Sequence, residues 1–105
     1  MNARAKPPAI AFPEALKTLR KARGLTQEDF SVVSSRTYIS ALERGLKSPT
    51  LEKINAISEV LGVHPLSLLV LGYQVAEGSD SSEELVARVL EELSAVANAG
   101  KIMKS

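Results

Sequence analysis

Apolar residues recur every three or four positions along most of this 105-residue chain, which is the spacing of amphipathic helices. Glycine, proline and small polar residues separate these apolar stripes at the places where helices begin and end. All the predicted elements are therefore helices, and the predicted fold class is all-α. The predicted helices span residues 13–23, 27–33, 36–44, 51–61, 66–72 and 83–98.

Residues 24–45 organise the chain as two short helices joined by a tight turn. In the first helix, Phe30 and Val33 are three positions apart, so they share one helical face and can point into a core. In the second, Ile39 and Leu42 form the inner face. Polar residues suited to helix starts are Thr26, Ser34, Ser35, Thr50, His64 and Ser81, and the glycines expected to end helices are Gly24, Gly45 and Gly62.

The composition is that of one small globular domain with an appended element. Apolar residues make up 45% of the chain, which is ordinary for a folded protein. Because the chain has no cysteine, it has neither a disulfide framework nor a thiolate metal site, and we expect it in the cytoplasm. No apolar run is long enough for a membrane span, so no membrane partner is expected. The length leaves no room for a separate small-molecule ligand domain.

The charges are unevenly distributed, although the net charge is only +1. Residues 1–50 carry nine basic and four acidic residues, whereas residues 51–105 carry four basic and eight acidic ones. A basic first half fits a face that binds phosphates, with the acidic half turned away. The same asymmetry also arises when charges merely solvate helix surfaces.

Four short motifs stand in the order GLTQE at 24–28, YISALERG at 38–45, SPTL at 48–51 and LGV at 61–63. Together, over about residues 12–71, they resemble the helix-turn-helix family of phage repressors and Cro proteins. One departure is the stretch from Gln27 to Tyr38, which is about two residues shorter than the common family pattern. Two serines also stand where the family has its usual turn glycine.

The resemblance implies a five-helix, lambda-repressor-like DNA-binding domain, to which an additional C-terminal amphipathic helix is attached. It also implies a sequence-specific transcriptional regulator, a repressor that binds double-stranded DNA as a homodimer on a palindromic operator. The expected organisation is a flexible N-terminal arm at 1–11, the helix-turn-helix domain at 12–72, a linker at 73–82, the C-terminal helix at 83–99 and a frayed tail at 100–105. Arg4 and Lys6 in the arm either follow the DNA or belong to a solvated tail.

The expected recognition helix is 36–44, because such helices present their N-terminal residues to base edges in the major groove. Arg36 can donate two hydrogen bonds to a guanine, and Arg44 with Lys47 fits phosphate contacts. The resemblance implies a phosphate contact for Gln27, which otherwise completes a helix cap; Tyr38 either reaches a phosphate or packs on the preceding helix. The expected DNA-binding residues are Gln27, Ser35, Arg36, Thr37, Tyr38, Ser40, Arg44 and Lys47.

The resemblance further implies an ion pair between Arg20 and Glu43. Such a pair clamps the first helix to the end of the recognition helix. Its value is orientation more than net stability, because desolvation offsets most of the Coulomb attraction. The alternative is an exposed Arg20 that contacts a DNA phosphate.

The last predicted helix, 83–98, has an apolar face too broad to remain in water. It either packs back on the preceding helices or meets its copy in a dimer, and we expect the dimer. The residues expected at this interface are Leu71, Leu85, Val89, Leu93 and Val96.

Other classes of function remain as alternatives. A protein-interaction module would keep the fold without specific DNA binding. Antitoxins and the controllers of restriction–modification systems are small members of the same family. An enzyme is not expected, because the chain has no Cys–His pair and no Gly-rich phosphate loop after a strand. No cofactor and no metal are expected either; His64, the only histidine, precedes a proline and fits a helix cap.

Overall fold

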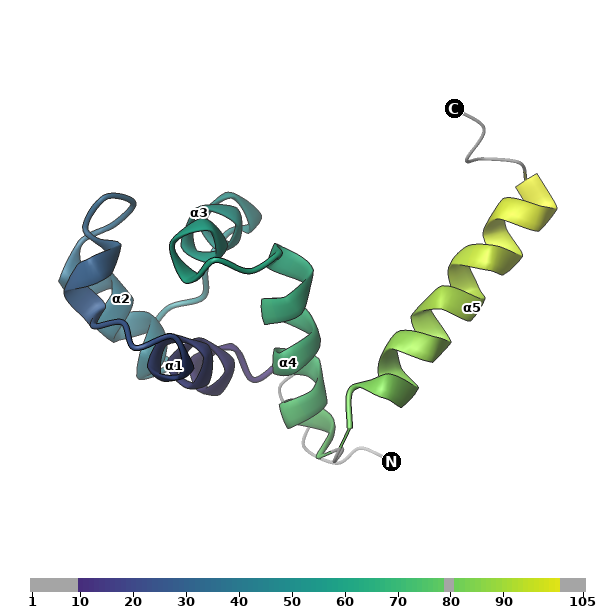
Figure 1. The fold of residues 1–105 in the computed structure, drawn as a ribbon, viewed down its shortest axis with the longest axis horizontal. Coiled ribbons are helices and arrows are strands. Elements are labelled where there is room, and N and C mark those ends of the chain that lie inside the picture. Colours follow the sequence, from purple (N-terminus) through teal and green to yellow (C-terminus); the bar gives the residue numbers. More distant parts are fainter. Residues whose placement is uncertain (1–9, 79–80, 101–105) are drawn as a thin grey trace.

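The computed structural model describes residues 10–78 and 81–100, and this part of the chain contains only helices and connecting turns (Figure 1). The predicted all-α fold class is thus confirmed. The elements are α1 (Phe12–Ala22), the 3₁₀ helix η1 (Gln27–Phe30), α2 (Arg36–Glu43), α3 (Leu51–Leu61), α4 (Pro65–Glu77) and α5 (Glu83–Gly100).

The first four α-helices and η1 enclose a single apolar core. Helix α1 packs on α4 and α2, while α3 packs on α4 and η1. Complete burial of a large apolar side chain contributes about 1.5–3 kcal/mol, so this cluster supplies most of the driving force for folding. The largest fully buried apolar side chains are Leu16, Phe30, Ile39, Leu42, Ile57, Leu61 and Leu68.

Several predicted helix caps are confirmed. The Thr50 hydroxyl accepts a hydrogen bond from the Lys53 amide at the start of α3 (3.1 Å), and His64 Nδ1 accepts from the Leu66 amide at the start of α4 (2.9 Å). Gly45 follows α2 with φ of +75°, a left-handed conformation that favours glycine. These caps fix the ends of the helices that surround the predicted DNA-binding motif.

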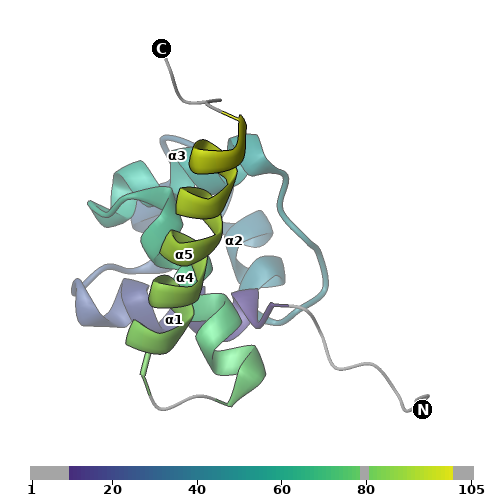
Figure 2. The same cartoon turned by 90° about the vertical axis from the view of Figure 1, so that its right-hand side faces the viewer.

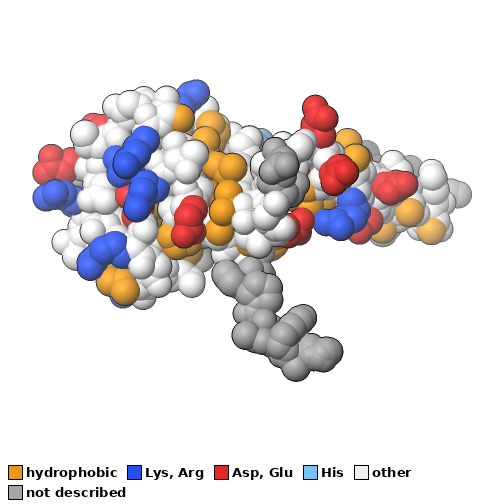
Figure 3. Space-filling model, turned by 90° about the horizontal axis from the view of Figure 1, so that it is seen from below, with side chains coloured by type: hydrophobic (Ala, Val, Ile, Leu, Met, Phe, Trp, Pro, Cys, Tyr) orange, Lys and Arg blue, Asp and Glu red, His pale blue; other side chains and the backbone are white. Residues whose placement is uncertain are grey.

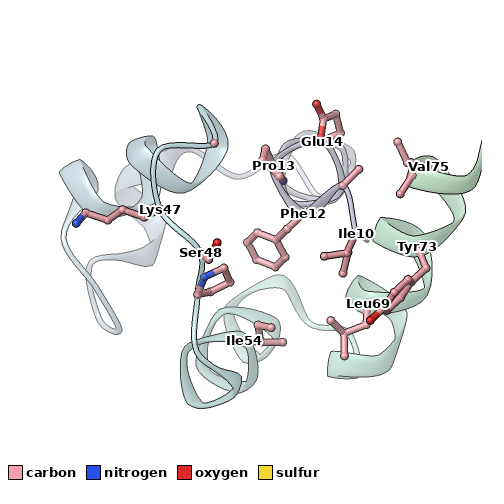
Figure 4. Close-up of a pocket in the computed structure, with 14 residues that line it drawn as sticks. Ile10, Phe12, Pro13, Glu14, Lys47, Ser48, Ile54, Leu69, Tyr73 and Val75 are labelled. Atoms are coloured by element: carbon pink, nitrogen blue, oxygen red, sulfur yellow. The ribbon is translucent and has the colours of Figure 1, made fainter. Parts of the chain in front are cut away.

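The predicted N-terminal arm is wrong at its last two residues, which belong to the core. The Ala11 amide donates to the Gly72 carbonyl (2.9 Å), and Ala11 is only 9% exposed. Ile10 lies against Gly72 so closely that a Cβ there would stand 2.5 Å from Ile10 Cγ1. The close approach depends on the missing side chain of Gly72. Ile10 and Phe12 line the cavity in Figure 4, whereas Arg4 and Lys6 lie outside the described residues.

The predicted linker at 73–82 is also wrong in its first half, because α4 continues through Glu77. The segment 73–77 contains no proline or glycine, so nothing in it interrupts the helix. Gly78, with φ of +71°, is the residue that ends α4. At the other side of the linker, the Ser81 hydroxyl accepts from the Glu83 amide (3.0 Å), and α5 then extends through Gly100.

Helix α5 stands apart from the core. Figures 1 and 2 show it on the outer side of α4, and none of its residues is buried. Among the described residues no single helix is long and apolar enough to cross a membrane; α3 and α4 meet that length and composition only as a pair bent by 104°, and both bury side chains in the core.

Candidate nucleic-acid interface

The turn that precedes α2 is shorter and tighter than predicted. The predicted α-helix at 27–33 is wrong: Gln27–Phe30 forms a 3₁₀ helix, followed by turns. Hydrogen bonds three residues apart run from the Ser31 amide to the Glu28 carbonyl and from the Val33 amide to the Phe30 carbonyl, and the Ser34 amide also donates to the Phe30 carbonyl as the chain turns. With about two residues fewer than the family pattern, the segment has to reverse direction immediately after Phe30.

Phe30 and Val33 nevertheless point inward as predicted, since Phe30 is fully buried and Val33 packs against the core. Between them Val32 is 82% exposed. At the start of the turn, Asp29 Oδ2 accepts hydrogen bonds from the Thr26 amide (2.7 Å) and the Thr26 hydroxyl (3.1 Å). The shortened turn therefore keeps its apolar anchors while its tip faces solvent.

Helix α2 begins at a serine cap and presents its first turn to solvent. The Ser35 hydroxyl accepts a hydrogen bond from the Tyr38 amide (3.0 Å). Ile39 and Leu42 are fully buried, as predicted, which fixes the rotation of the helix about its axis. Arg36 and Thr37 consequently lie on the exposed side.

Most of the predicted DNA-binding residues lie toward the two ends of α2. Arg36 and Gln27 line a shallow polar hollow of about 330 Å³ together with Arg20. At the far end of α2, Arg44 and Lys47 are exposed, and Figure 4 shows Lys47 pointing away from the cavity beneath its loop. Those on the surface are Ser35, Arg36, Thr37, Arg44 and Lys47, and those partly buried are Gln27, Tyr38 and Ser40.

Arg20 and Glu43 form a bidentate ion pair between α1 and the last residue of α2. Arg20 Nε lies 2.6 Å from Glu43 Oε2, and Arg20 Nη2 lies 3.0 Å from Glu43 Oε1. The third guanidinium nitrogen, Nη1, donates to the Leu25 carbonyl (2.9 Å). The side chains are only 12% and 2% exposed, so Arg20 is held within the fold rather than projecting toward a phosphate.

Gln27 joins this pair, which neither sequence-based expectation for it included. Its Nε2 donates to Glu43 Oε1 (3.1 Å). Burial by itself would raise the pKa of Glu43, but the hydrogen bonds from Arg20 and Gln27, with the positive charges of Arg20 and Lys17, lower that pKa below its usual value. The hydrogen bond from Arg20 to Glu43 raises the pKa of Arg20 in turn. The pair is therefore fully charged at neutral pH.

Tyr38 packs inward rather than standing free on the surface. Its ring lies against the core, and Lys53 Nζ from α3 sits 5.3 Å from the ring centroid. The same ammonium donates to the Val33 carbonyl (2.8 Å) at the end of the shortened turn. Lys53 therefore ties three parts together: the turn, the first turn of α2, and α3.

We expect Lys53→Met to lower the free energy of unfolding by on the order of 1–2 kcal/mol, because the Val33 carbonyl loses a charged donor and Tyr38 loses its cation–π partner. Urea denaturation followed by circular dichroism measures this. Lys21→Met, on the exposed side of α1, is the matched control and should change stability by less than about 0.5 kcal/mol. Equal stabilities for the two variants would show that Lys53 does not hold the turn.

Sequence reasoning missed Lys53 and Arg23. Arg23 Nε donates to the Leu61 carbonyl (2.8 Å) and Arg23 Nη2 to the Gly62 carbonyl (3.2 Å), which satisfies the C-terminal end of α3. Both side chains bond to residues that are 20 or more positions away. The spacing of side chains along one helix carries no signal for such hydrogen bonds.

The charge asymmetry seen in the sequence becomes a spatial one. Figure 3 shows most of the visible Lys and Arg side chains at the end of the molecule opposite α5, with some Asp and Glu side chains among them. Along α5, at the opposite end, acidic side chains outnumber basic ones. The exposed side of α2 thus belongs to the basic end of the molecule.

Comparison with known proteins gives several matches to this arrangement. A family model described as helix-turn-helix matches residues 16–68, from α1 into α4. The uncharacterized HTH-type transcriptional regulator y4dJ of Sinorhizobium fredii is 40% identical over 53 residues, which are 49% of this chain and 69% of that protein. The control protein C.BamHI of Bacillus amyloliquefaciens is 36% identical over 63 residues, which are 57% of this chain and 78% of that protein.

Two solved structures share the fold. The restriction-modification controller protein C.AhdI from Aeromonas hydrophila superposes with a TM-score of 0.53 and 31% identity, over 57% of this chain and 94% of that one. The hypothetical transcription factor NHTF from Neisseria has a TM-score of 0.53 and 27% identity, over 63% of this chain and 84% of that one.

Proposed function

This chain belongs to the helix-turn-helix family of DNA-binding transcriptional regulators, and from that premise we propose that it is a repressor that binds a palindromic operator as a homodimer in the cytoplasm. The observation that carries the proposal is the exposed N-terminal end of α2, together with the Arg20–Glu43 pair that fixes the other end of this helix to α1. Arg36 and Thr37 are therefore free to enter a major groove, while the inner side of the helix is fixed in the core.

We assign the contacts by position on α2. Arg36 and Thr37 read base edges, and the Ser35 hydroxyl, whose oxygen already accepts from Tyr38, can still donate to a phosphate. Arg44 and Lys47 contact phosphates at the far end and set the register. Gln27 contacts a phosphate from η1: one of its amide hydrogens bonds to Glu43, and the other can donate to the phosphate.

The apolar row on α5 supports the homodimer. Leu85, Val89, Leu93 and Val96 are all at least partly exposed on one side of this helix. Leu71, the fifth residue of the proposed interface, is partly buried against the core of its own chain. Two copies related by a two-fold axis would match two inverted half-sites.

A second candidate is the controller of a restriction–modification system. Two of the similar proteins, C.BamHI and C.AhdI, are controllers by name, and C.AhdI is covered over 94% of its length. Such a controller would use the same α2 surface on DNA. The two candidates differ in the genes they regulate rather than in the chemistry of the site.

A selection of bound sequences from a random duplex pool tests the proposal. We expect an inverted repeat with half-sites about 34–36 Å apart, and an affinity for it that falls with added salt while its preference over random DNA persists. A duplex with the same bases in scrambled order is the control. Failure to enrich any sequence, with weak binding to both duplexes, would contradict operator recognition and favour a protein-interaction module.

A further inference from the structure

A groove of about 660 Å³ runs between α4 and α5, and apolar side chains form both of its walls. Leu66, Val70 and Tyr73 line it from α4, while Val86, Val89 and Leu93 line it from α5. We call this the α4–α5 groove. Figure 1 shows α5 beside α4, with the axes of the two helices diverging.

The wall formed by α5 is one continuous apolar row. At 3.6 residues per turn, most of the apolar residues between Leu85 and Ala97 fall on one side of the helix. Leu90 and Leu93 are 59% and 60% exposed, and Val96 is 48% exposed. An isolated helix with such a row is not stable in water, so the row requires an apolar partner.

We propose that α5 of a second copy of this chain fills the α4–α5 groove, antiparallel to the first α5, so that the two copies interlock. This inference rests on the proposed homodimer and specifies its interface. It concerns a helix beyond residues 16–68, the part that the family match covers.

The shape of the groove favours a second copy as the occupant. In a two-fold dimer each copy contributes the same surface to the interface. The helix that lines the groove of one copy must therefore also fit into the groove of the other copy. Helix α5 meets this requirement, because its 18 residues span about 27 Å and its row of side chains is still exposed. Exposed apolar residues on both walls, including Leu66 and Tyr73, then become buried together.

The charges beside the row specify the antiparallel direction. Arg88 and Glu92 follow Leu85 along one edge of the row, whereas Ser94 lies at the other edge. About a two-fold axis, antiparallel helices bring the same edges together, so with the axis near Leu90, Arg88 lies opposite Glu92 of the second copy. A parallel pair would instead place Arg88 at the height of Ala87 and Leu90 of the second copy, which carry no charge. Among the described residues of its own chain, Arg88 forms an exposed ion pair with Glu77, at 3.8 Å.

A charge-exchange experiment tests this interface. Arg88→Glu alone and Glu92→Arg alone place like charges opposite each other twice in every dimer. Each variant should therefore raise the dimer dissociation constant by about tenfold or more at low salt, measured by sedimentation equilibrium. An equimolar mixture of the two variants should regain dimers, because opposite charges face each other again in the mixed pair.

Glu91→Arg is the matched control, since it makes the same charge change on the outer side of α5 and should leave dimerisation unchanged. Circular dichroism checks that every variant keeps its helices. The inference is overturned if wild-type protein is monomeric, if the single variants dimerise as the wild type does, or if the folded variants do not pair on mixing. Binding to the selected operator is measured separately: a dimer that ignores the operator refutes the proposed function and leaves this interface standing.

Discussion

Replacing Glu43 with alanine is expected to lower the free energy of unfolding by about 3–5 kcal/mol, because Arg20 would keep its place with no counter-charge. The Glu43 side chain is 2% exposed and Arg20 is 12% exposed, so water cannot easily take the place of the carboxylate. Gln27 would lose its acceptor as well. Urea denaturation gives the value. An unchanged slope of the unfolding free energy against urea concentration would show that the variant exposes the same surface on unfolding as the wild type.

The double variant Arg20→Met/Glu43→Leu is the informative control. It removes both charges and keeps apolar volume in their place, so its stability should lie within about 1 kcal/mol of the wild type. Its affinity for the operator should nevertheless fall, because the ion pair that holds α1 to the end of α2 is gone. A double variant as unstable as Glu43→Ala would show that packing, and not the unpaired guanidinium, causes the destabilisation.

The same carboxylate makes the stability depend on pH. Because folding lowers the pKa of Glu43, its contribution is complete above the unfolded value of about 4.3 and disappears as the pH falls through the lower folded value. The wild type should therefore lose stability below about pH 4 more steeply than Glu43→Gln, which has no proton to gain. Parallel pH profiles for the two proteins would contradict the assigned role of Glu43.

The helices that bury one face were predictable from the sequence alone. In α2, for example, Ile39 and Leu42 mark the buried side, and solvent exposure of Arg36 follows from them. The Arg20–Glu43 pair was predictable only through the family resemblance, because its members are 23 residues apart and lie on different helices.

The remaining features depend on tertiary contacts that spacing does not encode. The 3₁₀ form of η1 follows from the length available before α2, not from the propensities of its residues. The attachment of Ala11 to the core needs the bare backbone of Gly72, which lies in a different helix far along the chain. The glycine and serines near the end of the run 73–82 predict a linker, yet residues 73–77 contain no helix breaker and continue α4.

The second large effect is expected at the operator. Arg36→Ala should weaken binding by about 1–3 kcal/mol per half-site on the selected operator and relax specificity at one base pair, because alanine cannot donate the paired hydrogen bonds to guanine. Arg36 is suited to this role because it is exposed at the first residue of α2, next to the Ser35 cap that fixes the helix start. Competition binding against operators mutated at each position measures both quantities.

Two further variants separate base reading from charge. Arg36→Lys keeps the charge but not the planar fork, so it should reduce specificity nearly as far as alanine does while keeping affinity for random DNA. Lys47→Ala should weaken binding to all sequences alike and lower the salt slope by about one for each phosphate that is no longer neutralised. If Arg36→Lys retained full specificity, or if Arg36→Ala and Lys47→Ala weakened binding equally on cognate and random duplexes, Arg36 would be a phosphate-binding residue. The reading of bases would then have to come from Thr37 and Ser40, which lie on α2 at the same face.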